Sequence, residues 1–117
     1  MGGLLGHWSV WTNTAVKMFE MLKEAALSET VSAELLTLAV EVTDANAAFF
    51  DTANGFKGCI AGLHAVLRRQ KLMEGIWCLN EDETLSPGQM EEIDRVYRMY
   101  PHLNDDQFVA DNINNWA

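Results

Sequence analysis

The sequence predicts an all-α fold, a bundle of about five helices that forms one domain over residues 1–117. Three observations predict it. Apolar residues recur at helical spacing from about residue 13 to the end of the chain. Capping residues, glycines and prolines divide that pattern into five segments. A chain of 117 residues is long enough to bury a core without disulfide or metal support, and only one short segment favours a strand.

The segment that departs from the helical pattern lies in residues 1–12. The Leu, Trp and Val residues between Leu4 and Trp11 favour a strand, and Gly3 and Gly6 weaken a helix. A lone strand leaves its own backbone hydrogen-bonding groups unpaired. We therefore expect this segment to pair with its equivalent in a second copy of the chain, or to extend the first helix.

The first two helices are predicted over residues 13–27 and 32–54. Thr12 or Asn13 can cap the first helix, and Gly55 ends the second because glycine readily adopts a left-handed conformation. The predicted buried stripes are Ala15, Met18, Phe19, Leu22, Ala25 and Ala26 in the first helix, and Leu35, Leu38, Ala39, Val42, Asn46, Phe49, Phe50 and Ala53 in the second.

The third helix is predicted from about residue 56 to residue 72. Gly58 and Gly62 lie four residues apart on one side of it. A glycine inside a helix costs roughly 1 kcal/mol against alanine, so we expect another backbone to approach closely there. An irregular stretch follows from Gly75 to Leu85. The predicted apolar face consists of Phe56, Cys59, Ile60, Leu63, Val66 and Leu67.

Two capping boxes mark the last two helices. In residues 86–89, Ser86 caps the fourth helix and Gln89 completes the box, while Pro101 ends that helix. Residues 104–107 repeat the pattern for the last helix. The predicted apolar positions are Met90, Ile93, Tyr97 and Tyr100 in the fourth helix, and Phe108, Val109, Ile113 and Trp116 in the last.

The charge balance excludes two classes of partner. Eight Lys and Arg residues stand against 17 Asp and Glu residues, for a net charge of −9. A nucleic acid or an anionic membrane would repel such a chain, so we expect neither as a partner. No apolar run is long enough to cross a membrane, and no basic segment precedes the apolar start. We therefore expect a cytoplasmic protein in which Cys59 and Cys78 are reduced thiols.

Few residues suggest chemistry of their own. His7, His64 and His102 stand at none of the spacings typical of metal ligands, and no phosphate-binding or hydrolase motif occurs, so we expect no metal and no cofactor. A Schiff-base lysine must be desolvated, and Lys57, at a helix start, is the least implausible candidate. Cys78 is an alternative nucleophile, although no histidine lies near it in sequence.

The cluster His7-Trp8-Ser9 has the most functional character, because a His and a Ser at the end of an apolar segment could face a pocket. Four later stretches also stand out, namely residues 50–57, 67–79, 85–89 and 100–105. In combination and in this order, they resemble the C-terminal part of class I aldolases of the dihydrodipicolinate synthase and N-acetylneuraminate lyase superfamily, in a less characterised branch.

The resemblance implies the last βα unit and the helical extension of a TIM (β/α)8 barrel. Residues 1–12 resemble the eighth barrel strand, residues 13–27 the eighth barrel helix, and residues 28–117 the C-terminal helical extension. Within residues 50–57 the family has an Asn-Pro dipeptide leading into a helix, and here Gly55 replaces that proline.

The resemblance also implies a Schiff-base aldolase or lyase that acts on 2-oxo acids in its full-length parent. In the family the Schiff-base lysine lies on the sixth strand, the proton-relaying phenol on the fifth, and the carboxylate-binding loop after the second. This chain resembles only the part from the eighth strand onward, so no catalytic residue can be assigned. Barrel active sites open at the carboxyl ends of the strands, so His7, Trp8 and Ser9 would lie near the substrate in the parent.

Three functions therefore follow from the sequence. The first is the C-terminal portion of such an aldolase, with a structural and assembly role, inactive alone and expected in a homo-oligomer. The second is a free-standing helical module that binds a protein partner. The third is an independent small enzyme that uses Cys78 or His64.

Overall fold

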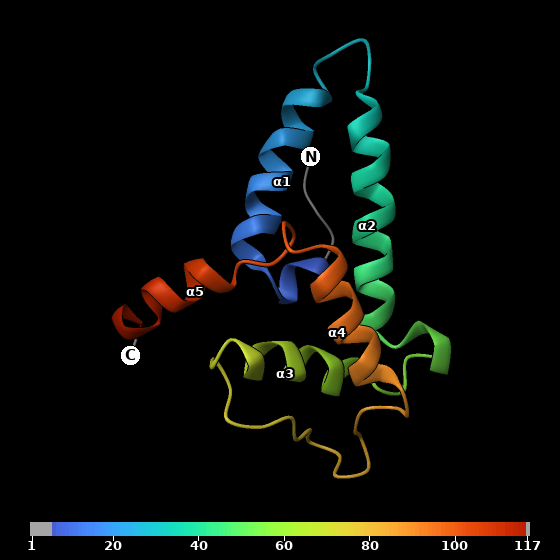
Figure 1. Ribbon diagram of the computed structural model, residues 1–117, viewed down its shortest axis with the longest axis vertical. Helices are drawn as coiled ribbons and strands as arrows, with labels where there is room; N and C mark the ends of the chain where they lie inside the picture. Colours follow the sequence, from blue (N-terminus) through green and yellow to red (C-terminus); the bar gives the residue numbers. More distant parts are fainter. Residues whose placement is uncertain (1–5, 117) are drawn as a thin grey trace.

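A computed structural model describes residues 6–116 of the chain and is all-α within them (Figure 1). The predicted all-α fold of about five helices is confirmed. The helices are α1 (Thr12–Ala25), α2 (Ala33–Phe49), α3 (Cys59–Arg69), α4 (Gln89–Met99) and α5 (Asp106–Asn112), with short 3-10 turns at His7–Ser9, Thr52–Asn54 and Ile113–Asn115. None of the helices in this part of the chain combines the length and the apolar character that a membrane span needs.

The predicted strand is wrong for residues 6–11, while Leu4 and Leu5 lie outside the described residues. His7–Ser9 forms a 3-10 turn, and Trp11 adopts a left-handed conformation with φ of 55°. Val10 and Trp11 are each only 1% exposed, because the chain's own helices cover them. The strand propensity of these side chains is overridden by burial, so they need no partner strand.

Trp11 lies at the centre of the core. Its indole N–H donates a hydrogen bond to the hydroxyl of Tyr97 at 3.0 Å. Its ring packs edge-on against Phe49 and Tyr97, with ring centroids 4.7 and 5.0 Å apart. This contact joins the start of α1 to α2 and α4, and burial raises the pKa of Tyr97, so its hydroxyl stays protonated.

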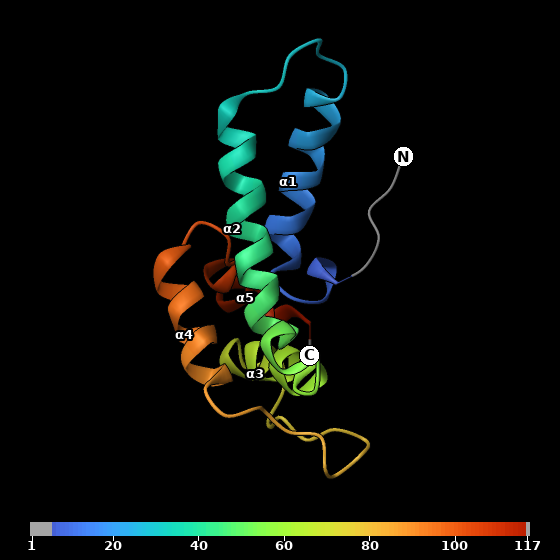
Figure 2. The same cartoon turned by 90° about the vertical axis from the view of Figure 1, so that its right-hand side faces the viewer.

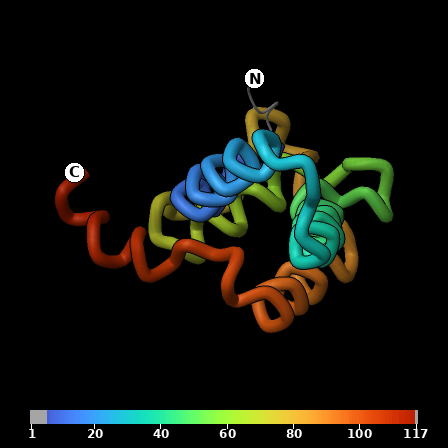
Figure 3. Tube along the Cα trace, turned by 90° about the horizontal axis from the view of Figure 1, so that it is seen from above, coloured from blue at the N-terminus to red at the C-terminus, as the bar shows by residue number. Residues whose placement is uncertain are grey.

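The helices form a body from which a hairpin rises. α1 and α2 run in opposite directions to a shared loop at one end of the molecule (Figures 1 and 2). α4 lies beside the other end of α2 and α3 crosses below it, while α5 points away from the body (Figure 3). We call residues 20–40, the outer parts of α1 and α2 with their loop, the arm. The other described residues, 6–19 and 41–116, are called the body. No residue of the arm is fully buried.

The core is confined to the body. It draws on the inner end of α2, on α3 and α4, and on residues before α1 and after α4. The buried hydrophobic residues that form its main cluster are Val10, Trp11, Ala45, Ala48, Phe49, Ala65, Val66, Ile93, Val96 and Leu103. The predicted stripes are therefore right near the body and wrong in the arm, where Leu22 is 44% exposed.

α3 turns inward part of the predicted face together with its glycine side, since Val66 is fully buried and Leu63 and Leu67 pack against the core. Phe56 and Ile60 are exposed, whereas the glycine side of the helix is buried. A Cβ atom on Gly62 would lie 2.1 Å from the carbonyl oxygen of Phe49, and one on Gly58 would lie 2.0 Å from Oε1 of Gln89. The predicted close approach of another backbone is confirmed at Gly62, whereas at Gly58 the close neighbours are the side chains of Gln89 and Asp51. The face of α3 that carries small residues packs against α2 and α4.

Side chains cap the first turns of α2 and α4 in different ways. Ser32 caps α2, since its hydroxyl accepts a hydrogen bond from the amide of Glu34 at 3.1 Å. Only half of the capping box before α4 forms, because the amide of Ser86 donates to Oε1 of Gln89 while the hydroxyl of Ser86 donates to Asp51. α4 consequently begins at Gln89 rather than next to Ser86.

Candidate functional site

The turn His7–Ser9 lies between α1 and α2. Nδ1 of His7 is 2.9 Å from Oδ1 of Asn46 on α2, and the ring of Trp8 packs edge-on against Phe19 of α1, with ring centroids 5.6 Å apart. An amide oxygen only accepts hydrogen bonds, so Nδ1 of His7 carries the proton. Nε2 of His7 is then a buried acceptor without a partner in the described part of the chain. Ser9 is exposed.

This geometry gives His7 and Trp8 a positioning role within the chain, because each contacts one helix of the hairpin. Their proximity to a substrate in a larger protein stays a prediction, and the same holds for Ser9. No catalytic residue is assigned to this turn.

Cys78 and His64 are brought together, which the sequence could not reveal. Sγ of Cys78 lies 3.9 Å from Nδ1 of His64. The same Nδ1 lies 3.0 Å from the carbonyl oxygen of Trp77, which can only accept, so Nδ1 holds a proton and cannot take one from the thiol. Burial, with a smaller effect of Glu83, raises the pKa of Cys78. The pair therefore lacks the thiolate that nucleophilic catalysis requires.

The remaining candidates are not arranged for catalysis. Burial, and then the charges of Asp51 and Glu83, raise the pKa of Cys59. Lys57 is exposed and lines a hollow together with Asp82 and Glu83, so its amine is not desolvated. Within residues 6–116 no three His, Cys, Asp or Glu side chains are grouped to hold a metal ion.

Asp51 carries a buried carboxylate and is 3% exposed. It accepts hydrogen bonds from the amide of Gly58 at 2.9 Å, from Nδ2 of Asn54 at 2.7 Å and from the hydroxyl of Ser86. Burial opposes its ionisation, but these three hydrogen bonds outweigh burial and hold its pKa below the ordinary value. Two of its partners lie within seven residues and Ser86 lies just before α4, so Asp51 has a structural role.

Gln89 extends the polar contacts around Asp51. Its side-chain amide donates to the carbonyl oxygens of Phe49 at 3.4 Å and Gly58 at 3.0 Å, and to that of Ala48 at 3.3 Å. These carbonyls belong to the end of α2 and the start of α3, and Gln89 itself is only 3% exposed. We call Asp51, Gln89 and their partners the polar junction. It joins α2, α3 and α4.

A second polar contact fixes α4 to α2. The guanidinium of Arg95 donates to both carboxylate oxygens of Asp44, at 2.7 and 2.8 Å, and the hydroxyl of Tyr100 donates to the same carboxylate at 2.7 Å. The hydrogen bonds from Arg95 are the largest cause that lowers the pKa of Asp44. The contact ties α4 to α2 just beyond the arm.

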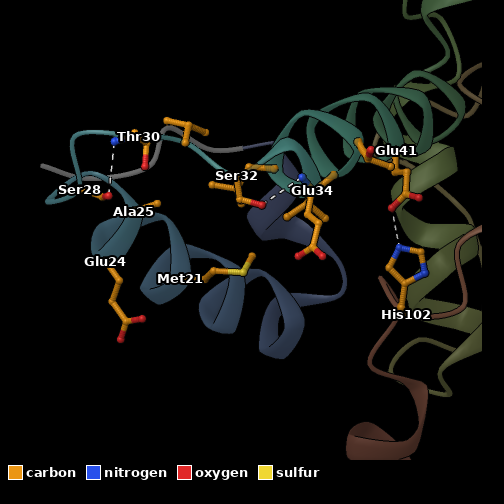
Figure 4. Close-up of a pocket in the computed structure, with 13 residues that line it drawn as sticks. Met21, Glu24, Ala25, Ser28, Thr30, Ser32, Glu34, Glu41 and His102 are labelled. Carbon is orange, nitrogen blue, oxygen red and sulfur yellow. Dashed lines mark hydrogen bonds and ion pairs between the residues drawn. The ribbon is translucent and has the colours of Figure 1, made fainter.

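The largest hollow described is a groove of about 760 Å³ between the two helices of the arm (Figure 4). Its apolar lining comes from Met21 and Ala25 of α1, Val31 of the loop, and Leu35 and Leu38 of α2. Its charged lining residues are Glu24, Glu34, Glu41 and His102. Nε2 of His102 pairs with the carboxylate of Glu41 at the body end of the groove.

The face of α2 opposite the groove is also apolar. Leu36 and Val40 are each 68% exposed. Together with Ala33, Thr43 and Ala47 they follow the alternating spacing of three and four residues that is typical of a helix–helix seam. We call these five residues the outer seam. It contains no charged residue.

The sequence contained a signal for both surfaces. α2 carries apolar residues on almost every side between residues 33 and 42. A helix that is apolar all round is normally buried, whereas this part of α2 is not. The prediction of a single buried stripe on this helix therefore missed its second apolar face, the outer seam.

Comparisons of the chain with protein-family models, with curated proteins and with solved structures found no match.

The polar junction predicts a pH-dependent loss of stability in Asp51→Asn. Folding lowers the pKa of Asp51, so its ionised form stabilises the fold at any pH above 3.8, and this contribution is lost as the pH falls from there. We expect the variant to lose about 2 kcal/mol at pH 7, because a charged acceptor of three hydrogen bonds is replaced. Urea unfolding at several pH values measures the loss.

The matched control is Asp82→Asn in the exposed loop, which should change stability by less than about 0.5 kcal/mol. The difference between wild type and Asp51→Asn should shrink below about pH 4, where the wild-type carboxylate takes up its proton. A variant as stable as wild type at pH 7, or a difference that persists in acid, would contradict the role given to Asp51.

Proposed function

We propose that this chain is the C-terminal portion of a Schiff-base, 2-oxo acid aldolase or lyase of the dihydrodipicolinate synthase family. Its role is structural and concerned with assembly, and it is inactive alone. The observation that carries the proposal is the arm, in which two helices expose apolar residues that residues 6–116 do not cover. Soluble monomers rarely expose such contiguous surface, so another protein surface is needed there.

The resemblance of the sequence to the part of the family after the seventh strand supports this proposal. The geometry of the candidate residues agrees with inactivity. Lys57 is exposed and Cys78 lacks a general base, so neither provides the activated nucleophile that an aldolase or lyase needs. The proposal includes a cytoplasmic location, no nucleic acid or membrane partner, and a 2-oxo acid as substrate only of the full-length parent.

Self-association is part of the proposal, and the outer seam supports it. Two copies of α2 can pack their outer seams against each other, because Leu36 and Val40 alternate with the small residues Ala33 and Ala47 and none of the five seam residues is charged. The free strand expected in residues 4–11 does not support association, since Val10 and Trp11 are buried in their own chain.

A free-standing helical protein-interaction module is the second candidate. The observation that favours it is the closed core of the body, in which Trp11 is covered by Phe49 and Tyr97 of the same chain. The DNA upstream of the Met1 codon distinguishes the two functions. An in-frame continuation that encodes seven barrel strands would establish the first and exclude the second.

We expect no catalysis of the aldolase type by the chain alone. Incubation with pyruvate and borohydride should leave the mass of the chain unchanged, because no described lysine is desolvated as a Schiff base requires. Mass spectrometry of the intact chain and of its peptides measures this. A pyruvyl adduct on Lys57 would contradict the proposed inactivity.

We expect the chain to form a dimer at high micromolar concentration that persists at high salt, because apolar burial drives it and salt screens the net charge of −9. Val40→Glu should give a monomer, since it places a charge at the centre of the outer seam. Leu79→Glu is the matched control, because Leu79 is fully exposed in a loop remote in sequence from α2. Light scattering measures the mass. A monomeric wild type would refute self-association.

A further inference from the structure

We propose that the groove of the arm binds a basic amphipathic helix of a partner polypeptide. The inference goes beyond the self-association proposed above, because it concerns the opposite face of α2 and a different occupant. It rests on three observations, namely the shape of the groove, the apolar floor and the sign of the charge around it.

The shape and floor of the groove suit a helix. Two helices flank it, and Met21 of α1 extends between them (Figure 4), while Leu35 and Leu38 of α2 line the same groove. The lining residues of α2 between Glu34 and Glu41 extend over about 10 Å, which is about two helical turns. A helix with apolar residues at i, i+3, i+4 and i+7 would complete a third side and bury this floor.

The charge around the groove selects a basic partner. Glu24, Glu34 and Glu41 line it, whereas no Lys or Arg does. The two lysines of this hairpin, Lys17 and Lys23, lie outside the lining, and Lys23 is paired with Glu20. Lysines or arginines on the flanks of a docked helix would therefore meet carboxylates on both walls.

The same charges disfavour this chain's own helices as the occupant. Residues 12–41 hold two lysines and five glutamates, so a second arm would bring like charges together. α3 ends in Arg68 and Arg69, but Arg69 pairs with Asp94 and stacks on the ring of Tyr97. The occupant is therefore a basic helix that residues 6–116 do not supply.

The test uses two fluorescent 14-residue peptides of identical pattern, one of Leu and Lys and one of Leu and Glu, in a fluorescence anisotropy titration. The protein carries Val40→Glu so that self-association through the outer seam does not enter. We expect the Leu/Lys peptide to bind and the Leu/Glu peptide to bind at least about tenfold more weakly. Binding should weaken as salt rises.

Three variants locate the site. Leu35→Asp should abolish binding, and Glu34→Lys should weaken it about tenfold. Glu91→Lys is the matched control, since both glutamates are exposed and lie in the first turn of a helix, and only Glu34 lines the groove. It should leave binding within about twofold. Circular dichroism verifies that each variant is folded.

Equal weakening by Glu91→Lys and Glu34→Lys would overturn the inference, because it would show diffuse attraction to an acidic protein. Unchanged binding by a folded Leu35→Asp variant would also overturn it. If Glu34→Lys restores self-association to the protein that carries Val40→Glu, the occupant is a second copy and the proposal is wrong. None of these outcomes bears on the outer seam, which Val40→Glu tests separately.

Discussion

The structure depends on the polar junction at the inner end of α2. A buried carboxamide and a buried carboxylate, those of Gln89 and Asp51, hold the end of α2 to α3 and α4. This requires backbones to approach so closely that Gly62 admits no Cβ atom. Because both side chains are buried, leaving their groups unpaired would cost more than any single apolar contact contributes. The junction therefore determines which end of α2 is packed.

The arm follows from that constraint. α3 and α4 are held at the last turns of α2, so neither reaches the residues before Glu41, and α5 points away from them. α2 nevertheless remains apolar along its whole length, with Leu36 and Val40 among its most exposed residues. Its two faces differ in charge, since the outer seam is uncharged and the groove is lined by glutamates. This difference in charge favours a second copy of the chain at the outer seam and a basic helix in the groove.

Much of this fold could be predicted from the sequence, where local chemistry determines the outcome. α2 begins next to Ser32 as expected, and Gly62 marks a close approach of the α2 backbone as expected. The strand was predicted wrongly because Trp11 combines strand propensity with a left-handed backbone that only its burial against Phe49 and Tyr97 stabilises. The exposure of the arm was missed because apolar spacing identifies a face without showing whether anything covers it.

Hydrogen–deuterium exchange, followed peptide by peptide, tests the central claim that no other part of residues 6–116 covers the arm. In dilute solution the amides of residues 20–40 should exchange much faster than those of the buried parts of α3 and α4, because only their own helical hydrogen bonds protect them. At concentrations where copies associate, exchange in α2 should slow. Arm amides that are as protected in dilute solution as the core amides would contradict the account.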